Sequence, residues 1–99
     1  MKLLTKKLRD ELPPLQATEG EEDPLVVCKF FHPRSQWTWY AIEFDGEDLF
    51  FGLVVGQFTE LGYFSLRELE AFVDDWGLGI ERDLHFQPKR LSEIEGGGA

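Results

Sequence analysis

Apolar and polar residues alternate in a pattern that predicts a β-hairpin at the centre of the chain. Two aromatic-rich runs, Trp37–Phe44 and Leu49–Val55, flank four polar residues that include Asp45 and Gly46. Asp and Gly tolerate the positive φ angles of a tight reversal, so the two runs are predicted to pair as antiparallel strands. The rest of the chain is expected to be organised around this hairpin.

Further extended segments are predicted on both sides of the hairpin. Leu25–His32 is rich in β-branched and aromatic residues, and Pro33–Gln36 is a typical reversal that leads into the hairpin. Leu61–Phe64 is expected to form a short fourth strand, and Ile80–Pro88 a further extended segment. Sequential strands joined by short turns favour a small antiparallel β-meander of four to five strands.

Two short helices are predicted to pack on this sheet. Thr5–Leu12 has a threonine N-cap, ends at two prolines and carries leucines on one face. Ser65–Trp76 begins with a capping box, because Glu68 follows Ser65 by three residues. The apolar positions of this second helix predict one buried stripe, formed by Leu66, Leu69, Phe72, Val73 and Trp76.

The predicted fold class is therefore α+β, with an antiparallel meander and two short helices. Residues 1–95 are expected to form a single domain, and residues 96–99 a flexible tail after a final helical turn at Leu91–Ile94. Gln16–Asp23 carries four acids and no periodicity, which is typical of a solvated loop.

Neither strand of the hairpin has a clean polar face. Strict alternation places Trp37, Trp39 and Glu43 on one side of their strand and Tyr40 on the other. A sheet with one face in water should alternate apolar and polar residues, so both faces are predicted to be covered. Two short helices cover such a sheet only in part, and some aromatic surface is expected to remain for a partner chain or ligand.

Composition and charge narrow the class of protein further. A hydrophobic fraction of 42% in 99 residues excludes a disordered chain and supports one core. The net charge of −9, with the basic residues spread along the chain, argues against non-specific nucleic-acid binding. No apolar run reaches the length of a membrane span. The single cysteine is typical of a reducing, cytoplasmic compartment.

Several runs of the sequence carry a family resemblance: KFF-HP at Lys29–Pro33, WTWY at Trp37–Tyr40, ELGYFSL at Glu60–Leu66 and IERDL-HF-QP at Ile80–Pro88. From Leu3 to about Glu93 the chain resembles the bacterial family catalogued as domain of unknown function twenty-nine fifty-eight. The resemblance implies an association with mobile genetic elements, because members occur on plasmids and integrative conjugative elements as well as on chromosomes. The family has no agreed activity and no agreed catalytic residues, so none is carried over.

No residue pattern predicts a catalytic site, a metal site or a cofactor. Cys28, His32 and His85 are the soft metal ligands of the sequence, and on one strand Cys28 and His32 would lie about 13 Å apart, too far to share an ion. Ser65 is accounted for as a helix cap, and the glycines match no nucleotide-binding fingerprint. Paired carboxylates more often belong to turns and helix ends than to acid–base catalysis.

The predicted function is a protein-binding or adaptor module whose surplus apolar surface docks a protein partner or a second copy of the chain. The residues expected at its binding site are Trp37, Trp39, Tyr40, Glu43, Asp45 and Phe51. An adaptor requires an exposed apolar patch that contains one of the two tryptophans. One alternative is an acidic decoy that imitates DNA phosphates against a host DNA-binding enzyme, and a second is an enzyme of unknown reaction.

Overall fold

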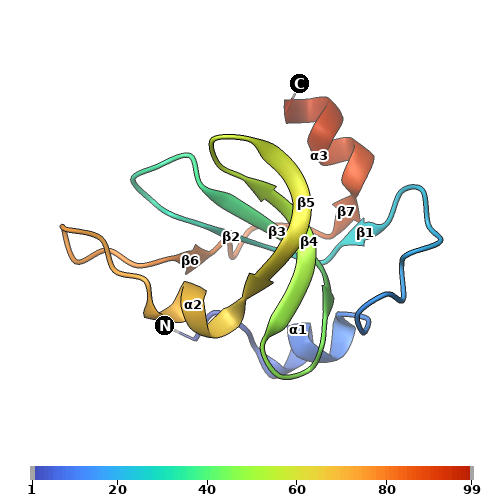
Figure 1. Cartoon of the computed structure of the whole chain (residues 1–99), viewed down its shortest axis with the longest axis horizontal. Helices are drawn as coiled ribbons and strands as arrows, with labels where there is room; N and C mark the ends of the chain where they lie inside the picture. Colours follow the sequence, from blue (N-terminus) through green and yellow to red (C-terminus); the bar gives the residue numbers. More distant parts are fainter. Residues whose placement is uncertain (1, 99) are drawn as a thin grey trace.

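The computed structural model describes the backbone of residues 2–98 and the side chains of residues 2–94. A five-stranded antiparallel sheet of order β5-β4-β3-β2-β6 forms its centre (Figure 1). Its strands are β2 (Cys28–Phe31), β3 (Thr38–Phe44), β4 (Leu49–Val55), β5 (Thr59–Ser65) and β6 (Glu81–Arg82). A two-stranded sheet consists of β1 (Leu25–Val26) and β7 (Lys89–Arg90), and the helices are α1 (Lys6–Glu11), α2 (Leu66–Ala71) and α3 (Leu91–Gly98). The predicted α+β class with an antiparallel sheet is confirmed.

The central hairpin forms as the sequence predicts. The strands β3 and β4 pair antiparallel. In the turn between them, the Asp45 carboxylate accepts the backbone N–H groups of Glu47, Asp48 and Leu49 at 2.8–3.0 Å. Gly46 has a φ of +91°, a conformation that glycine adopts at little cost. Asp45 is therefore a turn-forming residue, which is a role that its position after a β-strand favours.

A β-bulge in β3 changes the face on which several residues lie. The pairing of β3 with β4 shifts between Ala41 and Glu43, which leaves Ile42 as an extra residue. Glu43 consequently pairs with Phe51 and lies on the opposite face of the sheet from Trp39. The prediction that Glu43 and Trp39 share a face is wrong, because strict alternation takes no account of a bulge.

Apolar side chains cover both faces of the sheet, as the strands predict. On one face the larger cluster includes Phe30, Phe50 and Phe64, and it is closed by the N-terminal segment and by α2. On the other face β1, β7 and α3 cover a smaller cluster, formed by Val26, Ile42, Leu53 and Leu91. This second, C-terminal cover explains how so short a chain buries both sides of its central strands.

The predicted strand at Leu25–His32 is divided between the two sheets. Its first two residues form β1 and pair with β7, and Cys28–Phe31 form β2 and pair with β3 and β6. Val27 lies between the two strands, and its backbone N–H donates to the carbonyl of Ala41. The chain thus passes from the small sheet to the large one without a turn.

The helix predicted at Ser65–Trp76 is shorter than expected. Its Ser65 cap is confirmed, since the Ser65 hydroxyl accepts the N–H of Glu68, but α2 ends at Ala71. Beyond it the Asp74 carboxylate accepts backbone N–H groups of its own loop, so this acid favours a turn over a further helical turn. The outer part of the predicted stripe is exposed: Phe72, Val73 and Trp76.

The remaining elements differ from the predictions mainly at their ends. Helix α1 has the predicted threonine cap, and β5 is longer than the Leu61–Phe64 segment predicted for it. Ile80–Pro88 contains β6 and a turn that leads to β7. The tail predicted at residues 96–99 falls on residues whose side chains lie outside the described part. None of the helices described in residues 2–98 is both long and apolar enough to cross a membrane.

Candidate functional site

A groove of about 550 Å³ lies on the face of the sheet that α2 covers. We call it the tryptophan groove and define it by five of its lining residues: Trp37, Trp39, Phe64, Leu69 and Phe72. The strand β3 and the residue before it supply the tryptophans, β5 supplies one wall, and α2 with the residue after it supplies the other. Its largely apolar lining favours an apolar ligand group.

The two indole rings form one wall of the tryptophan groove. The rings of Trp37 and Trp39 stack with centroids 5.9 Å apart and an angle of 24° between their planes. Trp37 is 44% exposed, and Trp39 is half-buried. A Cβ atom at Gly56 would overlap the Trp37 ring, so this glycine makes room for the indole. The stacking of the two rings agrees with the prediction that Trp37 and Trp39 lie on one side of their strand.

A hydrogen-bonded chain through the buried His32 closes one end of the groove. The His32 Nδ1 atom lies 3.0 Å from the Ser35 hydroxyl, and Nε2 lies 2.9 Å from a carboxylate oxygen of Asp74. With the proton on Nε2, the hydroxyl donates to the imidazole and the imidazole donates to the carboxylate. The chain ties the turn at Pro33–Gln36 to the loop that follows α2.

Serine, histidine and aspartate also form hydrolytic triads, in which histidine takes the proton of the serine nucleophile. Here Ser35 lies in the same turn as His32, and its hydroxyl oxygen also accepts the N–H of Trp37 at 3.2 Å. Asp74 likewise holds two backbone N–H groups of its own loop. Because each of these bonds connects or shapes the two loops, we assign the chain a structural role at the rim of the groove.

Asp74 is charged in this arrangement. The N–H of Leu78 lowers the pKa of the Asp74 carboxyl, burial opposes it, and the N–H of Trp76 and the His32 imidazole lower the pKa further. The net result is a pKa below the ordinary value for aspartate. A carboxylate that keeps its charge remains a strong acceptor for the imidazole N–H.

Large apolar side chains surround the groove on its solvent side. Phe72 is 46% exposed and meets the edge of the His32 ring, and Trp76 is 74% exposed. The Arg34 guanidinium lies 4.2 Å from the centre of the Trp76 ring, so a cation–π contact holds this indole over the Pro33–Gln36 turn. Such a concentration of exposed aromatic groups is typical of an interaction surface.

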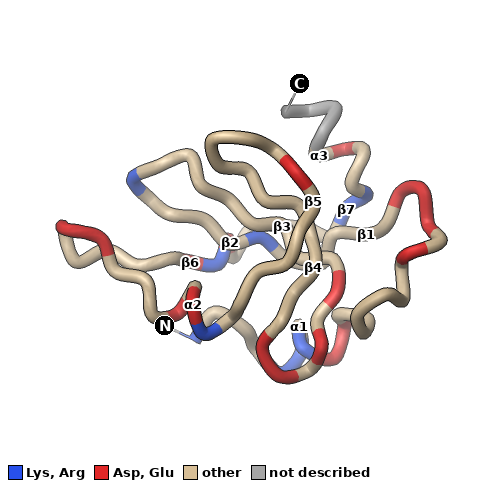
Figure 2. The backbone as a smooth tube through the Cα atoms, in the orientation of Figure 1, with Lys and Arg blue, Asp and Glu red and all other residues tan. Residues whose placement is uncertain are grey.

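A second groove, of about 320 Å³, lies on the opposite face of the sheet. We call it the acidic groove and define it by its apolar floor of Phe51, Leu61 and Tyr63 and by four carboxylates around it: Glu19, Glu21, Glu22 and Glu43. Figure 2 shows the acids of the loop before β1 at the end of the molecule where β7 carries basic residues. The Arg90 guanidinium lies 4.0 Å from a carboxylate oxygen of Glu21.

The carboxylate of Glu43 is buried at the base of the acidic groove. It accepts the backbone N–H of Gln16 at 2.8 Å, the backbone N–H of Thr18 at 2.9 Å and the Thr18 hydroxyl. Burial raises the pKa of Glu43, but these hydrogen bonds together outweigh it and the pKa lies below the ordinary value. Gln16 adopts a positive φ of 73° to make its contact. Glu43 therefore organises the acidic loop.

The six residues predicted for the binding site are not brought together. Trp37 and Trp39 line the tryptophan groove, and Glu43 and Phe51 line the acidic groove on the other face. Tyr40 packs against Phe86, with ring centroids 6.1 Å apart, under the C-terminal part of the chain. Asp45 lies in the hairpin turn. Two of the six predicted residues thus form part of the groove that has the larger volume.

The tryptophan groove also contains residues for which the sequence predicts other roles. Phe72 stands at helical spacing in the predicted buried stripe, and His32 is one of the soft metal ligands of the sequence. No local sequence pattern predicts the contact between His32 and Asp74, because 42 positions separate the two residues. A serine three residues after a histidine, within a proline turn, is the one local indication of the Ser35 contact.

The cysteine and the buried polar side chains of residues 2–94 are accounted for by the fold. Burial raises the pKa of the Cys28 thiol to about 12, so the thiol stays protonated among apolar neighbours. Within the described residues, no group of three or more His, Cys, Asp and Glu side chains lies close enough to hold a metal ion. The described buried side-chain polar atoms all have a hydrogen-bond partner.

The structure defines a small α+β protein with one groove on each face of a five-stranded sheet. A family model described as "Protein of unknown function (DUF2958)" matches residues 3–94, and the chain belongs to this family. This finding confirms the resemblance carried by the WTWY and ELGYFSL runs. No curated protein and no solved structure matches the chain.

Proposed function

We propose that this protein is a protein-binding module that takes an apolar side chain of a partner into the tryptophan groove. The observation that carries this proposal is the exposure of two aromatic residues around one cavity: Trp37 is 44% exposed and Phe72 is 46% exposed. Large aromatic side chains beside a preformed pocket are the usual anchors of protein interfaces.

The apolar area that a docked side chain buries limits the strength of such a contact. A docked aromatic side chain that buries about 150–250 Å² contributes roughly 4–6 kcal/mol at about 25 cal/mol per Å². Association costs subtract from that gain, so one side chain alone gives an affinity no tighter than tens of micromolar. A specific partner must therefore make contacts beyond the groove.

A random peptide library selected on the immobilised chain tests the proposal. The expected result is enrichment of peptides with aromatic or large aliphatic residues, whose affinity falls about tenfold for Phe72→Ala. Leu84→Ala is the matched control, because Leu84 is 67% exposed on the turn beside β6 and lines neither groove. Absence of enrichment, or equal losses for the two variants, would contradict the proposal.

The acidic decoy has less support from the positions of the acids. Figure 2 shows the acids on separate loops: the loop before β1, the β3–β4 turn and the loop after α2. The carboxylates of Asp45, Asp48 and Asp74 accept hydrogen bonds from the chain, which accounts for these acids without DNA mimicry. The decoy and the association with mobile genetic elements stay predictions.

A further inference from the structure

The outer edge of β5 is open to pairing. β5 is the terminal strand of the five-stranded sheet, and its seven residues pair with β4 from Thr59 to Ser65 without a bulge. Within residues 2–98 no other strand pairs with its outer edge. Edge strands are commonly protected by proline, charged side chains, a bulge or short length, and of these β5 has one charged residue, Glu60 near its start. The opposite edge, β6, has only two residues.

The two grooves lie on the two faces of this edge strand. Phe64 of β5 lines the tryptophan groove, whereas Leu61 and Tyr63, whose ring packs on Phe51, face the acidic groove. Side chains of a strand alternate between its faces, and a strand added beside β5 would continue the sheet. Alternate side chains of an added strand would therefore point toward the tryptophan groove and toward the acidic groove.

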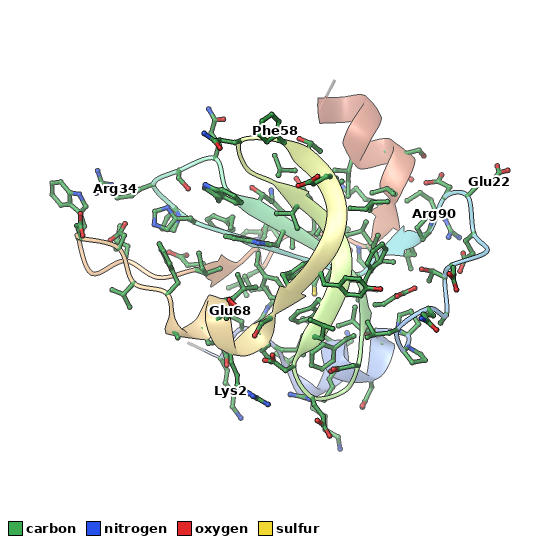
Figure 3. The ribbon with its side chains drawn as sticks, in the orientation of Figure 1. Lys2, Glu22, Arg34, Phe58, Glu68 and Arg90 are labelled. Carbon is green, nitrogen blue, oxygen red and sulfur yellow. The ribbon has the colours of Figure 1, made fainter. Side chains whose placement is uncertain are left out.

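The charges around the grooves indicate which side chains fit. Glu19 and Glu22 are exposed at the acidic groove, and Glu43 is buried in it with hydrogen bonds from the chain. The Arg90 guanidinium lies 4.0 Å from the Glu21 carboxylate and offsets part of the negative charge at this groove. Figure 3 shows Glu22 and Arg90 at the same end of the molecule, with Glu22 pointing outward. The surplus of negative charge favours lysine or arginine on that face.

We propose that β5 receives an extended segment of a partner protein as an added antiparallel or parallel strand, with apolar side chains toward the tryptophan groove and basic side chains toward the acidic groove. This binding mode rests on the proposed function and extends it, since backbone hydrogen bonds along β5 supply the contacts that a single docked side chain lacks. It assigns the partner a chemistry: a segment in which apolar and basic residues alternate.

A second copy of the chain is the less favourable occupant of the same edge. Each copy carries a net charge of −9, and pairing β5 with β5 would bring two strongly acidic molecules edge to edge. Neither β5 sequence supplies a basic residue to the acidic groove of the other copy. A basic segment neutralises the acidic groove instead of adding to its charge.

Synthetic peptides of about seven residues that alternate leucine and lysine test the binding mode. One derivative carries N-methyl groups on its leucines and the other on its lysines. Each derivative therefore lacks the N–H donors along one edge of the peptide and keeps those along the other edge. Strand addition predicts that one derivative loses binding and the other keeps it, because only one edge of the peptide faces β5. It also predicts slower hydrogen exchange at the β5 amides when the unmethylated peptide is bound.

The charge of the acidic groove is tested with variants of the full chain. Glu19→Lys combined with Glu22→Lys is expected to weaken binding of the leucine–lysine peptide about tenfold and to reduce its salt dependence. Asp10→Lys combined with Glu11→Lys is the matched control, since both acids are exposed on α1 and line neither groove. The control is expected to keep most of the affinity.

Three outcomes would overturn strand addition. The first is equal binding of both methylated peptides, and the second is equal weakening by the two charge-reversed variants. The third is a dimer with protected β5 amides and no peptide binding, which would assign the edge to a second copy. Library peptides that depend on Phe72 but not on their backbone N–H groups would preserve the proposed function and overturn only this binding mode.

Discussion

The side chain of Glu43 in β3 accepts two hydrogen bonds from Thr18, one from the backbone N–H and one from the hydroxyl, although 25 positions separate the residues. The bulge that follows Ala41 makes this contact possible, because it directs Glu43 to the face on which the acidic loop lies. One irregularity in the central strand thus positions one wall of a groove.

Replacement of Glu43 by glutamine is expected to destabilise the fold. The amide would present N–H groups where the chain offers further N–H donors, so partly buried donors would lose their acceptor. The expected loss is about 1–3 kcal/mol in the free energy of unfolding, measured with urea. Thr18→Val is the milder comparison, with an expected loss of about 1 kcal/mol because one hydroxyl is removed. A change below about 0.5 kcal/mol for Glu43→Gln would contradict the role given to this carboxylate.

The contribution of Glu43 to the free energy of unfolding should depend on pH. Its pKa in the folded protein lies below the ordinary value of 4.5, so its stabilisation is fully present above that value and is lost as the pH falls through the folded-state pKa. The difference in unfolding free energy between the wild type and Glu43→Gln is therefore expected to shrink between about pH 7 and about pH 3. Urea titrations at several pH values measure it, and a constant difference would be inconsistent with a charged Glu43.

Two glycines that face each other across β4 and β5 should respond differently to substitution. A Cβ atom at Gly52 would overlap the backbone carbonyl of Tyr40, whereas a Cβ atom at Gly62 meets no atom within 4 Å. Gly52→Ala is expected to cost about 3 kcal/mol or more, because backbone must move. Gly62→Ala is the matched control and is expected to change stability by less than about 1 kcal/mol. Similar urea midpoints for the two variants would refute the close approach of Gly52 to the Tyr40 carbonyl beside the β3 bulge.

Substitution of Gly56 tests the position of the Trp37 ring without removing the ring. The added methyl group would overlap the far edge of the indole, which is partly exposed and free to turn away from its place in the groove. Gly56→Ala is expected to fold with little loss of stability and to weaken groove-binding peptides by about tenfold. Isothermal titration of a selected peptide measures this effect, and Gly20→Ala, where a Cβ atom meets nothing within 4 Å, serves as control. Undiminished binding would place the peptide elsewhere.

The loop after α2 should lose order when Asp74 is replaced by alanine. The substitution removes the acceptor of two backbone N–H groups and of the His32 imidazole. The expected cost is about 1–2 kcal/mol, with faster hydrogen exchange at Trp76 and Leu78. Asp75→Ala provides the neighbouring control. Equal exchange rates in the two variants would exclude the structural role given to the Ser35–His32–Asp74 chain.

Local signals in the sequence predicted the elements that local contacts build. The hairpin turn at Asp45 and the capped ends at Thr5 and Ser65 satisfy backbone donors within a few residues, so their residue types reveal them. The apolar spacing predicts a longer helix than α2, because Phe72 and Val73 continue the pattern. Asp74 ends that pattern through bonds to a later turn, which the spacing does not contain.

The candidate site could be predicted only in part, because its walls come from distant segments. The aromatic pair Trp37 and Trp39 is visible in the sequence, and its position beside β5 depends on the order of strands in the sheet. The bulge in β3 moves Glu43 to the other face without any local glycine or proline to mark it. The pairing of His32 with Asp74 likewise follows from the path of the chain after α2.

The most direct test of the tryptophan groove is chemical-shift mapping of the isotope-labelled wild-type chain with a library-selected peptide. The largest changes are expected at the indole N–H groups of Trp37 and Trp39 and at the backbone amides of Tyr63–Leu69. Largest changes at Leu84 or at Asp10 of α1, which line neither groove, would contradict binding in the tryptophan groove.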